Sequence, residues 1–319
     1  MKAAVLNKLG SVPVYMDFPD PVPQDETQIV MNVKAAALKN LDKVKTRECY
    51  YAHYQQLPVV VGTDGVGTLP DGTKVYALGI TGTMGQRALI SANRYTVLPD
   101  NIDFALAAAL PNAVLGSAIP LIDRAEMKSG DVVLINGATG ITGKVAVQIA
   151  KHFGASKIIV TGRNQETLLQ LKALGADISI SLLQNDESFV QQIKDVDQNT
   201  PIDIVLDYIW GKPAELIIQS FQNRHGNKIK FVTMGDMAGQ TFPISSGILR
   251  SADIILMGSG FGSLTKVVLD EYSNKILPNM FTLAASGKLT IETENMRLRD
   301  INTAWTTVTN GKRLVLLID

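Results

Sequence analysis

The chain has 319 residues, a length comfortable for two domains because compact domains cluster at roughly 100 to 200 residues. Hydrophobic residues make up 46% and charged residues 19%, which excludes the composition of a disordered chain. The formal net charge is zero and no long run of like charges occurs, so neither nucleic acid nor an anionic membrane is expected as a partner.

The opening segment MKAAVLNKLG lacks an apolar core followed by a small-residue cleavage site, so no secretion signal is expected. No stretch approaches the roughly 18 apolar residues that a membrane-spanning helix needs. We therefore expect a soluble, cytoplasmic protein whose partners are small molecules. Cys49 is the only cysteine, which excludes an intramolecular disulfide and a structural zinc site built from several cysteines.

Short strand-like runs broken by Pro, Gly and other turn residues dominate the first 110 residues or so. Their alternation of apolar and polar residues predicts a mostly β module. The predicted strands are 3–6, 28–33, 58–61, 74–78 and 86–91.

From Asp131 onward, apolar runs alternate with helical periodicity, which is the pattern of βαβ units and a parallel sheet. Residues 144–153 and 166–174 are predicted crossover helices, because their apolar residues recur at three- and four-residue spacing. A helical run through Leu283 and an apolar strand at 313–318 follow, and this strand either extends the parallel sheet or returns to the first module. The predicted strands of the sheet are 132–136, 157–161, 202–207, 229–234 and 254–257.

A glycine-rich turn joins the first of these strands to the first helix. Gly140 lets the backbone approach a pyrophosphate, Gly143 allows close packing of helix on strand, and the helix N-terminus offers free N–H groups. The usual first glycine of such a motif is replaced by Ala138. The residues predicted to contact a dinucleotide here are Gly137, Ala138, Thr139, Gly140, Ile141, Thr142 and Gly143.

The second strand ends in Gly162, Arg163 and Asn164, where a protein that prefers NADH would carry Asp or Glu. A carboxylate would repel a 2′-phosphate, whereas the Arg163 guanidinium can pair with it through two hydrogen bonds. These three residues therefore favour NADPH. Ligands of open parallel sheets bind beyond the carboxyl ends of the strands, so further cofactor contacts are expected there. They are Asp207, Tyr208, Met234, Gly235, Asp236, Gly258, Ser259 and Gly260.

Four segments together resemble the medium-chain dehydrogenase/reductases, and most closely their zinc-free, quinone-oxidoreductase-like branch. The segments are GTDGVG, ALPNAVLGSA, GDVVLINGATGITGKVAVQIAKHFGA and LKALGAD. The resemblance implies an α/β protein with two domains. Residues 1–115 and 261–319 would form a GroES-like, mostly β domain, and residues 116–260 a Rossmann domain with a doubly wound parallel sheet.

The resemblance also bears on metal binding. Lys39, Thr63 and Asn112 stand at the positions where zinc-dependent relatives hold the metal. None of them supplies the thiolate or imidazole that catalytic zinc prefers, so no metal is expected. Without a Lewis acid, a quinone or conjugated enone is a better acceptor than a simple ketone, because it spreads the developing charge over its π-system.

Candidate catalytic and pocket residues follow from the same resemblance. Lys39 would lie near the absent metal and Tyr51 in the loop before GTDGVG, and both are catalytic candidates; a buttressing lysine and a packing tyrosine are the alternatives. Tyr54 and Asn112 are expected to line the substrate pocket. Asp42 and Asp64 are expected nearby, with helix capping and hydrogen bonding as their alternative roles.

These features predict an NADPH-dependent oxidoreductase that transfers hydride to a quinone or conjugated enone without zinc. Another activated double bond, such as that of an acyl thioester, is a second acceptor class. The alternative from another class is a non-catalytic NADPH-binding sensor or structural protein of the same fold. The apolar segment SADIILMGSG would leave an exposed strand edge, and the resemblance implies a homodimer formed through it.

Overall fold

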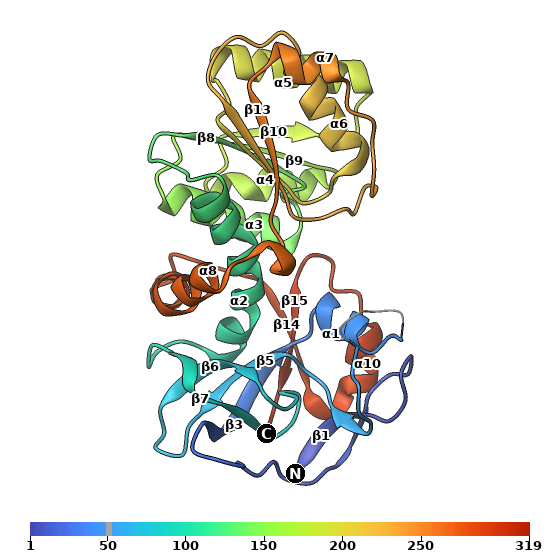
Figure 1. Cartoon of the computed structure of the whole chain (residues 1–319), viewed down its shortest axis with the longest axis vertical. Helices are drawn as coiled ribbons and strands as arrows, with labels where there is room; N and C mark the ends of the chain where they lie inside the picture. Colours follow the sequence, from blue (N-terminus) through green and yellow to red (C-terminus); the bar gives the residue numbers. More distant parts are fainter. Residues whose placement is uncertain (49–52) are drawn as a thin grey trace. The chain divides into compact units, whose positions relative to one another are not determined.

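The computed structural model describes residues 1–48 and 53–319. The chain forms two compact units, Met1–Pro111 with Ser273–Asp319 and Asn112–Tyr272 (Figure 1). The unit limits thus lie at 111/112 and 272/273, where the sequence predicted 115/116 and 260/261.

The first unit is built on antiparallel strands. Its six-stranded sheet has the order β14-β15-β3-β5-β6-β7, and an additional pairing of β3 with β7 closes four of these strands on themselves. A small sheet has the order β2-β1-β4. The strands are β1 (Lys2–Leu6), β2 (Val14–Asp17), β3 (Gln28–Ala37), β4 (Val59–Val60), β5 (Asp64–Thr68), β6 (Lys74–Gly79), β7 (Arg87–Val97), β14 (Thr293–Arg297) and β15 (Arg313–Leu317).

The C-terminal strand β15 belongs to the first unit. β15 pairs antiparallel with β3 through Val315 and Ala37, so the chain returns to the first module instead of extending the parallel sheet. The helices that accompany these strands include α1 (Asn40–Lys45), α9 (Leu277–Ala285) and α10 (Ile301–Thr306). The inward residues of both sheets form one core with α10, in which Met31, Met84 and Ile90 are fully buried.

The second unit carries a sheet covered by helices (Figure 1). All its strands are parallel, in the order β10-β9-β8-β11-β12-β13. The chain starts at β8, runs outward to β10 and then continues on the other side of β8, so the strand order reverses between β8 and β11. The strands are β8 (Val132–Asn136), β9 (Lys157–Gly162), β10 (Ile178–Ser181), β11 (Ile204–Asp207), β12 (Ile229–Thr233) and β13 (Ile254–Gly258).

Helices alternate with these strands, as the apolar spacing predicted. They are α3 (Ile141–His152), α4 (Gln165–Leu174), α5 (Asp186–Asn199), α6 (Gly211–Ser220) and α7 (Ser246–Ser251), with α8 (Lys266–Glu271) after β13. A parallel Rossmann-like sheet together with an antiparallel strand unit confirms the predicted fold class. Ligand sites of such sheets lie at the carboxyl edge near the strand-order reversal, which here involves β8 and β11.

The expectation that no stretch could span a membrane is wrong by length and composition. Helix α2 (Phe104–Ile119) continues into a π-helical turn, and the 21 residues Phe104–Arg124 are long and apolar enough to cross a membrane. However, 72% of the most apolar part of this segment is buried inside the structure. The core helix of a soluble protein can have the same length and composition as a membrane-spanning helix, so these two properties alone do not separate them.

Candidate functional site

The glycine turn lies between β8 and α3, as the sequence predicted. A Cβ on Gly143 would stand 2.5 Å from the Cα of Ala138, so only glycine permits this approach of helix to strand. Gly140 precedes α3, and the nearest atom to its missing Cβ is 3.8 Å away. No side chain caps the first turn of α3. Its backbone N–H groups are therefore open to an anion.

At the end of β9, Arg163 is exposed, and residues 162–164 contain no acid. Asn164 is the N-cap of α4, where its side-chain oxygen accepts from the N–H of Thr167 at 2.9 Å. A Cβ on Gly162 would lie 2.3 Å from Cγ2 of Thr139. Gly162 therefore makes room for the side chain of Thr139 in the glycine turn of residues 137–143 (the phosphate turn), in addition to the space predicted for a ligand.

A buried polar network ties the carboxyl ends of four strands together. Asp207 is fully buried and accepts from Nδ2 of Asn136 at 2.8 Å, from the N–H of Trp210 at 3.0 Å and from Oγ1 of Thr233 at 3.1 Å. Thr161 donates its hydroxyl to Oδ1 of Asn136 at 2.6 Å. Burial raises the pKa of Asp207, although the hydrogen bonds oppose this. The carboxylate thus fixes the strand ends on which a cofactor would lie.

Tyr208, the next residue, is fixed in the same way. Its hydroxyl donates to the carbonyl oxygen of Gly116 at 2.9 Å and lies 3.4 Å from Oγ of Ser117, both on α2. Burial raises the pKa of the Tyr208 phenol. Its side chain therefore anchors the end of β11 to α2.

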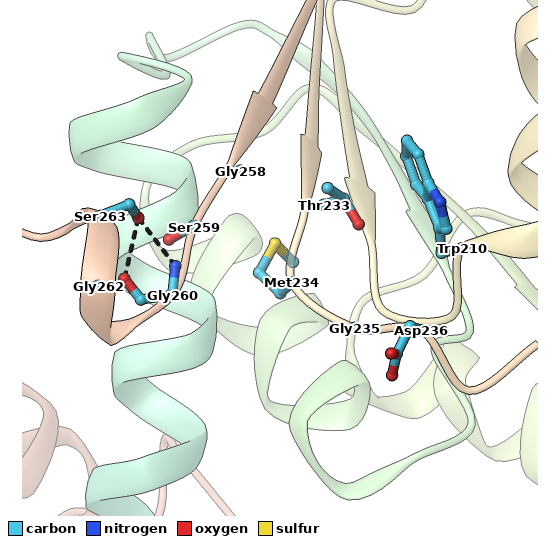
Figure 2. Close-up of a pocket in the computed structure, with 10 residues that line it drawn as sticks. All are labelled: Trp210, Thr233, Met234, Gly235, Asp236, Gly258, Ser259, Gly260, Gly262 and Ser263. Carbon is cyan, nitrogen blue, oxygen red and sulfur yellow. Dashed lines mark hydrogen bonds between the residues drawn. The ribbon is translucent and has the colours of Figure 1, made fainter. Parts of the chain in front are cut away.

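An open pocket of about 530 Å³ lies beyond the ends of β12 and β13 (Figure 2). Neither Gly258 nor Gly260 has any atom within 4 Å of its missing Cβ, so their backbone is accessible to a flat ligand. Ser263 holds the turn, with its hydroxyl 3.0 Å from the N–H and 2.9 Å from the carbonyl oxygen of Gly260. The residues that line the pocket are Trp210, Thr233, Met234, Gly235, Asp236, Gly258, Ser259, Gly260, Gly262 and Ser263.

Six of these residues were predicted from the sequence, namely Met234, Gly235, Asp236, Gly258, Ser259 and Gly260. The other four, Trp210, Thr233, Gly262 and Ser263, were not singled out. Trp210 adopts φ 53° and ψ −153°, a conformation that favours glycine, and its ring packs 4.5 Å from that of Phe242. A tryptophan followed by a helix-starting glycine gives no sequence signal for this turn.

In the first unit, Lys39 lies among carboxylates. Its ammonium forms a hydrogen-bonded ion pair with Oδ1 of Asp64 and lies 3.7 Å from Oδ2 of Asp42. Tyr76 donates its hydroxyl to the other oxygen of Asp64 at 2.9 Å. Burial lowers the pKa of Lys39, but the two carboxylates outweigh this effect and the pKa is raised. Lys39 is therefore a buried, paired cation with 4% of its surface exposed.

Asp42 confirms its alternative role as a helix-capping residue. Its Oδ2 accepts from the backbone N–H of Lys39 at 2.9 Å, and its Oδ1 accepts from the N–H and the hydroxyl of Thr63 at 3.0 and 2.8 Å. Lys39 and Thr63, two of the three positions matched to zinc ligands, thus meet at one carboxylate. Asn112, the third, lies half-buried in α2 of the other unit.

Tyr54 is hydrogen-bonded beside this network, next to Thr63 in the chain of contacts. Its hydroxyl accepts from the N–H of Gly62 at 3.3 Å, and the ammonium of Lys45 lies 5.1 Å from its ring centre. Burial, together with the charge of Asp42, raises the pKa of Tyr54 to about 12. Tyr51, the catalytic candidate of this loop, lies outside the described residues, as does Cys49.

Comparison with known proteins places these sites in a family. The family described as "Zinc-binding dehydrogenase" matches residues 142–276. A "Probable NADPH-dependent quinone reductase" of Emericella nidulans is 24% identical, with 99% of this chain and 100% of the relative covered. A chloroplastic NADPH-dependent alkenal/one oxidoreductase of Arabidopsis thaliana is 34% identical over 56% of this chain and 52% of its own length.

Solved structures share the fold over the whole chain. A mycobacterial quinone oxidoreductase has a TM-score of 0.84 at 19% identity, with 99% of both chains covered. The quinone oxidoreductase of Thermus thermophilus, also solved with NADPH, has a TM-score of 0.77 at 23% identity and covers 99% of this chain and 100% of its own.

The chain belongs to the medium-chain dehydrogenase/reductase superfamily. Within this superfamily it is quinone-oxidoreductase-like, as its motifs predicted. Membership supports an oxidoreductase.

The matched family is named for zinc, but the side chains that stand at the zinc-ligand positions of this chain do not suit the metal. Lys39 offers an ammonium that is already bonded to Asp64, and Thr63 donates its hydroxyl to Asp42. Neither is a thiolate or imidazole ligand. Residues 1–48 and 53–319 contain no group of three or more His, Cys, Asp or Glu side chains that could hold a metal ion.

Proposed function

We propose that this protein is an NADPH-dependent, zinc-independent reductase of quinones or conjugated enones. The observation that carries the proposal is the carboxyl edge of one parallel sheet. There the open phosphate turn of residues 137–143, the exposed Arg163 and the glycine-lined pocket of Gly258 and Gly260 follow strands of that sheet. The Emericella and Arabidopsis relatives, named as a quinone reductase and an alkenal/one oxidoreductase, support the same reaction class.

NADPH, when bound, supplies a hydride from its nicotinamide ring. The N–H groups at the start of α3 would hold its pyrophosphate, and the guanidinium of Arg163 would pair with its 2′-phosphate. Gly258 and Gly260 leave their backbone open to the flat ring. The buried Asp207 network keeps these strand ends fixed, so that cofactor and acceptor are oriented without reorganisation.

The acceptor class follows from where the positive charge lies. Lys39 is committed to Asp64 and Asp42, so its ammonium does not stabilise an alkoxide on a simple ketone. A quinone or enone spreads the transferred charge over its own π-system and needs less help from the protein. Solvent would supply the proton that completes the reduction.

The test is oxidation of NADPH by the purified protein against a panel of quinones and conjugated enones. NADH and a metal chelator serve as controls. We expect turnover that prefers NADPH and is unchanged by the chelator. Loss of activity with the chelator would refute zinc independence, and tight NADPH binding without turnover on any acceptor would instead favour a cofactor-sensing or structural protein.

We also propose a cytoplasmic homodimer formed through β13. This strand lies at one edge of the parallel sheet, and Ile255 and Leu256 are 38% and 36% exposed. An apolar edge strand of this kind is an aggregation hazard unless it is covered, and pairing with a second copy covers it.

A further inference from the structure

Four buried charges gather at one place in the first unit. Lys39 and Arg313 are positive, Asp42 and Asp64 are negative, and none is more than 8% exposed. Among the described residues of this unit, these are the only charged side chains buried to that extent. Their charges sum to zero, which is the condition under which buried ions are tolerated.

The ammonium of Lys39 lies near three oxygen atoms. Besides its ion pair with Asp64, it lies 3.4 Å from the carbonyl oxygen of Ala37 and 3.7 Å from Oδ2 of Asp42. Arg313 contributes the second positive charge from β15, and its charge interacts with both carboxylates. If Lys39 were neutral, one guanidinium would face two buried carboxylates, leaving an uncompensated negative charge.

A chain of hydrogen bonds leads from this cluster to Tyr54. Asp42 accepts twice from Thr63, and the neighbouring Gly62 donates its N–H to the hydroxyl of Tyr54. The N–H of Tyr54 in turn donates to the carbonyl oxygen of Lys45 at 3.2 Å, and Lys45 ends the helix that contains Asp42. The ring of contacts is closed, so a displacement of Asp42 would displace Tyr54.

We propose that Lys39 is a positioning residue whose ammonium takes the electrostatic place of the metal that its family's name implies. It neutralises Asp42 and Asp64 and thereby fixes Tyr54 for binding of the acceptor, and it does not touch the acceptor itself. The part of the inference that concerns acceptor binding rests on the proposed function. The part that concerns charge balance stands on the structure of this unit alone.

The experiment compares three variants with the wild-type protein. Lys39→Met keeps the length of the side chain without its charge. Lys39→Met combined with Asp64→Asn restores neutrality, because Asp42 then faces Arg313 alone. Lys34→Met removes an exposed lysine from β3 and is the matched control. Urea unfolding, the Kd of NADPH, and the KM and kcat for the best quinone or enone are measured for each.

We expect Lys39→Met to lower the folding equilibrium constant about a hundredfold or more, because it leaves one buried carboxylate charge without compensation. We expect KM for the acceptor to rise about tenfold from the displacement of Tyr54, with the Kd of NADPH unchanged. The double variant should recover most of both losses. Lys34→Met should behave as the wild-type protein.

A double variant that folds well but keeps the raised KM of Lys39→Met would overturn the proposal, because Lys39 would then act on the acceptor directly. If Lys39→Met yields no folded protein, recovery of folded double variant supports the charge balance and its failure refutes it. If the wild-type protein reduces no acceptor, the proposed function fails, and the unfolding midpoints alone decide the charge balance.

Discussion

The side-chain amide of Asn136 donates to the carboxylate of Asp207 across 2.8 Å at the carboxyl edge of the parallel sheet. The two residues end β8 and β11, the strands between which the strand order reverses. The carboxyl edge of the sheet is therefore held together by the carboxylate of Asp207, which is fully buried from solvent. Its burial makes this acid testable by substitution and by pH.

Asp207→Ala should destabilise the protein by about 3 kcal/mol, because the donors of Asn136, Trp210 and Thr233 would lose a buried acceptor. Asp207→Asn keeps one oxygen for Asn136 and Trp210, and its amide can donate to the hydroxyl of Thr233. It should cost less than about 1.5 kcal/mol. Urea unfolding of both variants at one pH measures the difference, and equal losses would contradict the hydrogen-bonding role.

The pH dependence of stability provides a separate check on Asp207. Burial raises its pKa in the folded protein above the value of about 3.9 in the unfolded chain. Between these two values the folded state binds more protons, so the contribution of Asp207 to stability falls as pH rises through this window. Asp207→Asn does not titrate and should gain on the wild-type protein over the same window. Parallel curves of unfolding free energy against pH would refute the raised pKa.

Arg163→Ala should weaken binding of NADPH about 10- to 100-fold, because two charge-assisted hydrogen bonds to the 2′-phosphate are lost. Binding of NADH should change less than about twofold, since NADH has no 2′-phosphate. Titration of both cofactors measures this, with exposed Lys172→Ala on α4 as the control for loss of one surface charge. Equal losses for the two cofactors would remove Arg163 from the phosphate site.

Two glycines of the phosphate turn should respond differently to alanine. Gly143→Ala places a Cβ 2.5 Å from the Cα of Ala138 and should destabilise the fold by about 2 kcal/mol. Gly140→Ala places its Cβ no closer than 3.8 Å to any atom, at the carbonyl oxygen of Gly137, and should change stability by less than about 1 kcal/mol. Both should weaken NADPH binding, Gly140→Ala by obstructing the ligand directly. A stable Gly140→Ala protein with unchanged affinity would place the pyrophosphate elsewhere.

The parts of the fold that the sequence predicted are those with local signals. The predicted runs that became β8, β9, β11 and β12 are rich in buried apolar residues, because a central parallel strand is covered on both faces. Strand β10, with the sequence ISIS, and β14, with TENMR, lie at sheet edges and carry polar residues, so neither run stands out. Their places come from pairing with neighbours distant in the chain.

The candidate site likewise has parts with a local sequence signal and parts formed by residues far apart in the chain. The phosphate turn and Arg163 are readable because the strand, turn and helix that form them are consecutive. The ion pair of Lys39 with Asp64 joins residues 25 positions apart, and Arg313 approaches from the far end of the chain. No local pattern predicts that a lysine and two acids neutralise one another. Sequence resemblance therefore marked Lys39 as unusual, and only the structure shows where its charge goes.

The exposed edge of β13 predicts the state of assembly. Leu256 pairs on one side with Phe231 of β12, and the other side of the strand has no partner in the described chain. Leu256→Lys would place like charges close together where two β13 edges meet, and should raise the dimer dissociation constant at least about tenfold. Leu169→Lys on α4, where Leu169 is 70% exposed, is the matched control and should leave the dimer intact. Sedimentation over a concentration series measures both. A wild-type protein that remains monomeric at high concentration would refute the dimer, and a dimer that survives Leu256→Lys unchanged would place the interface on another surface.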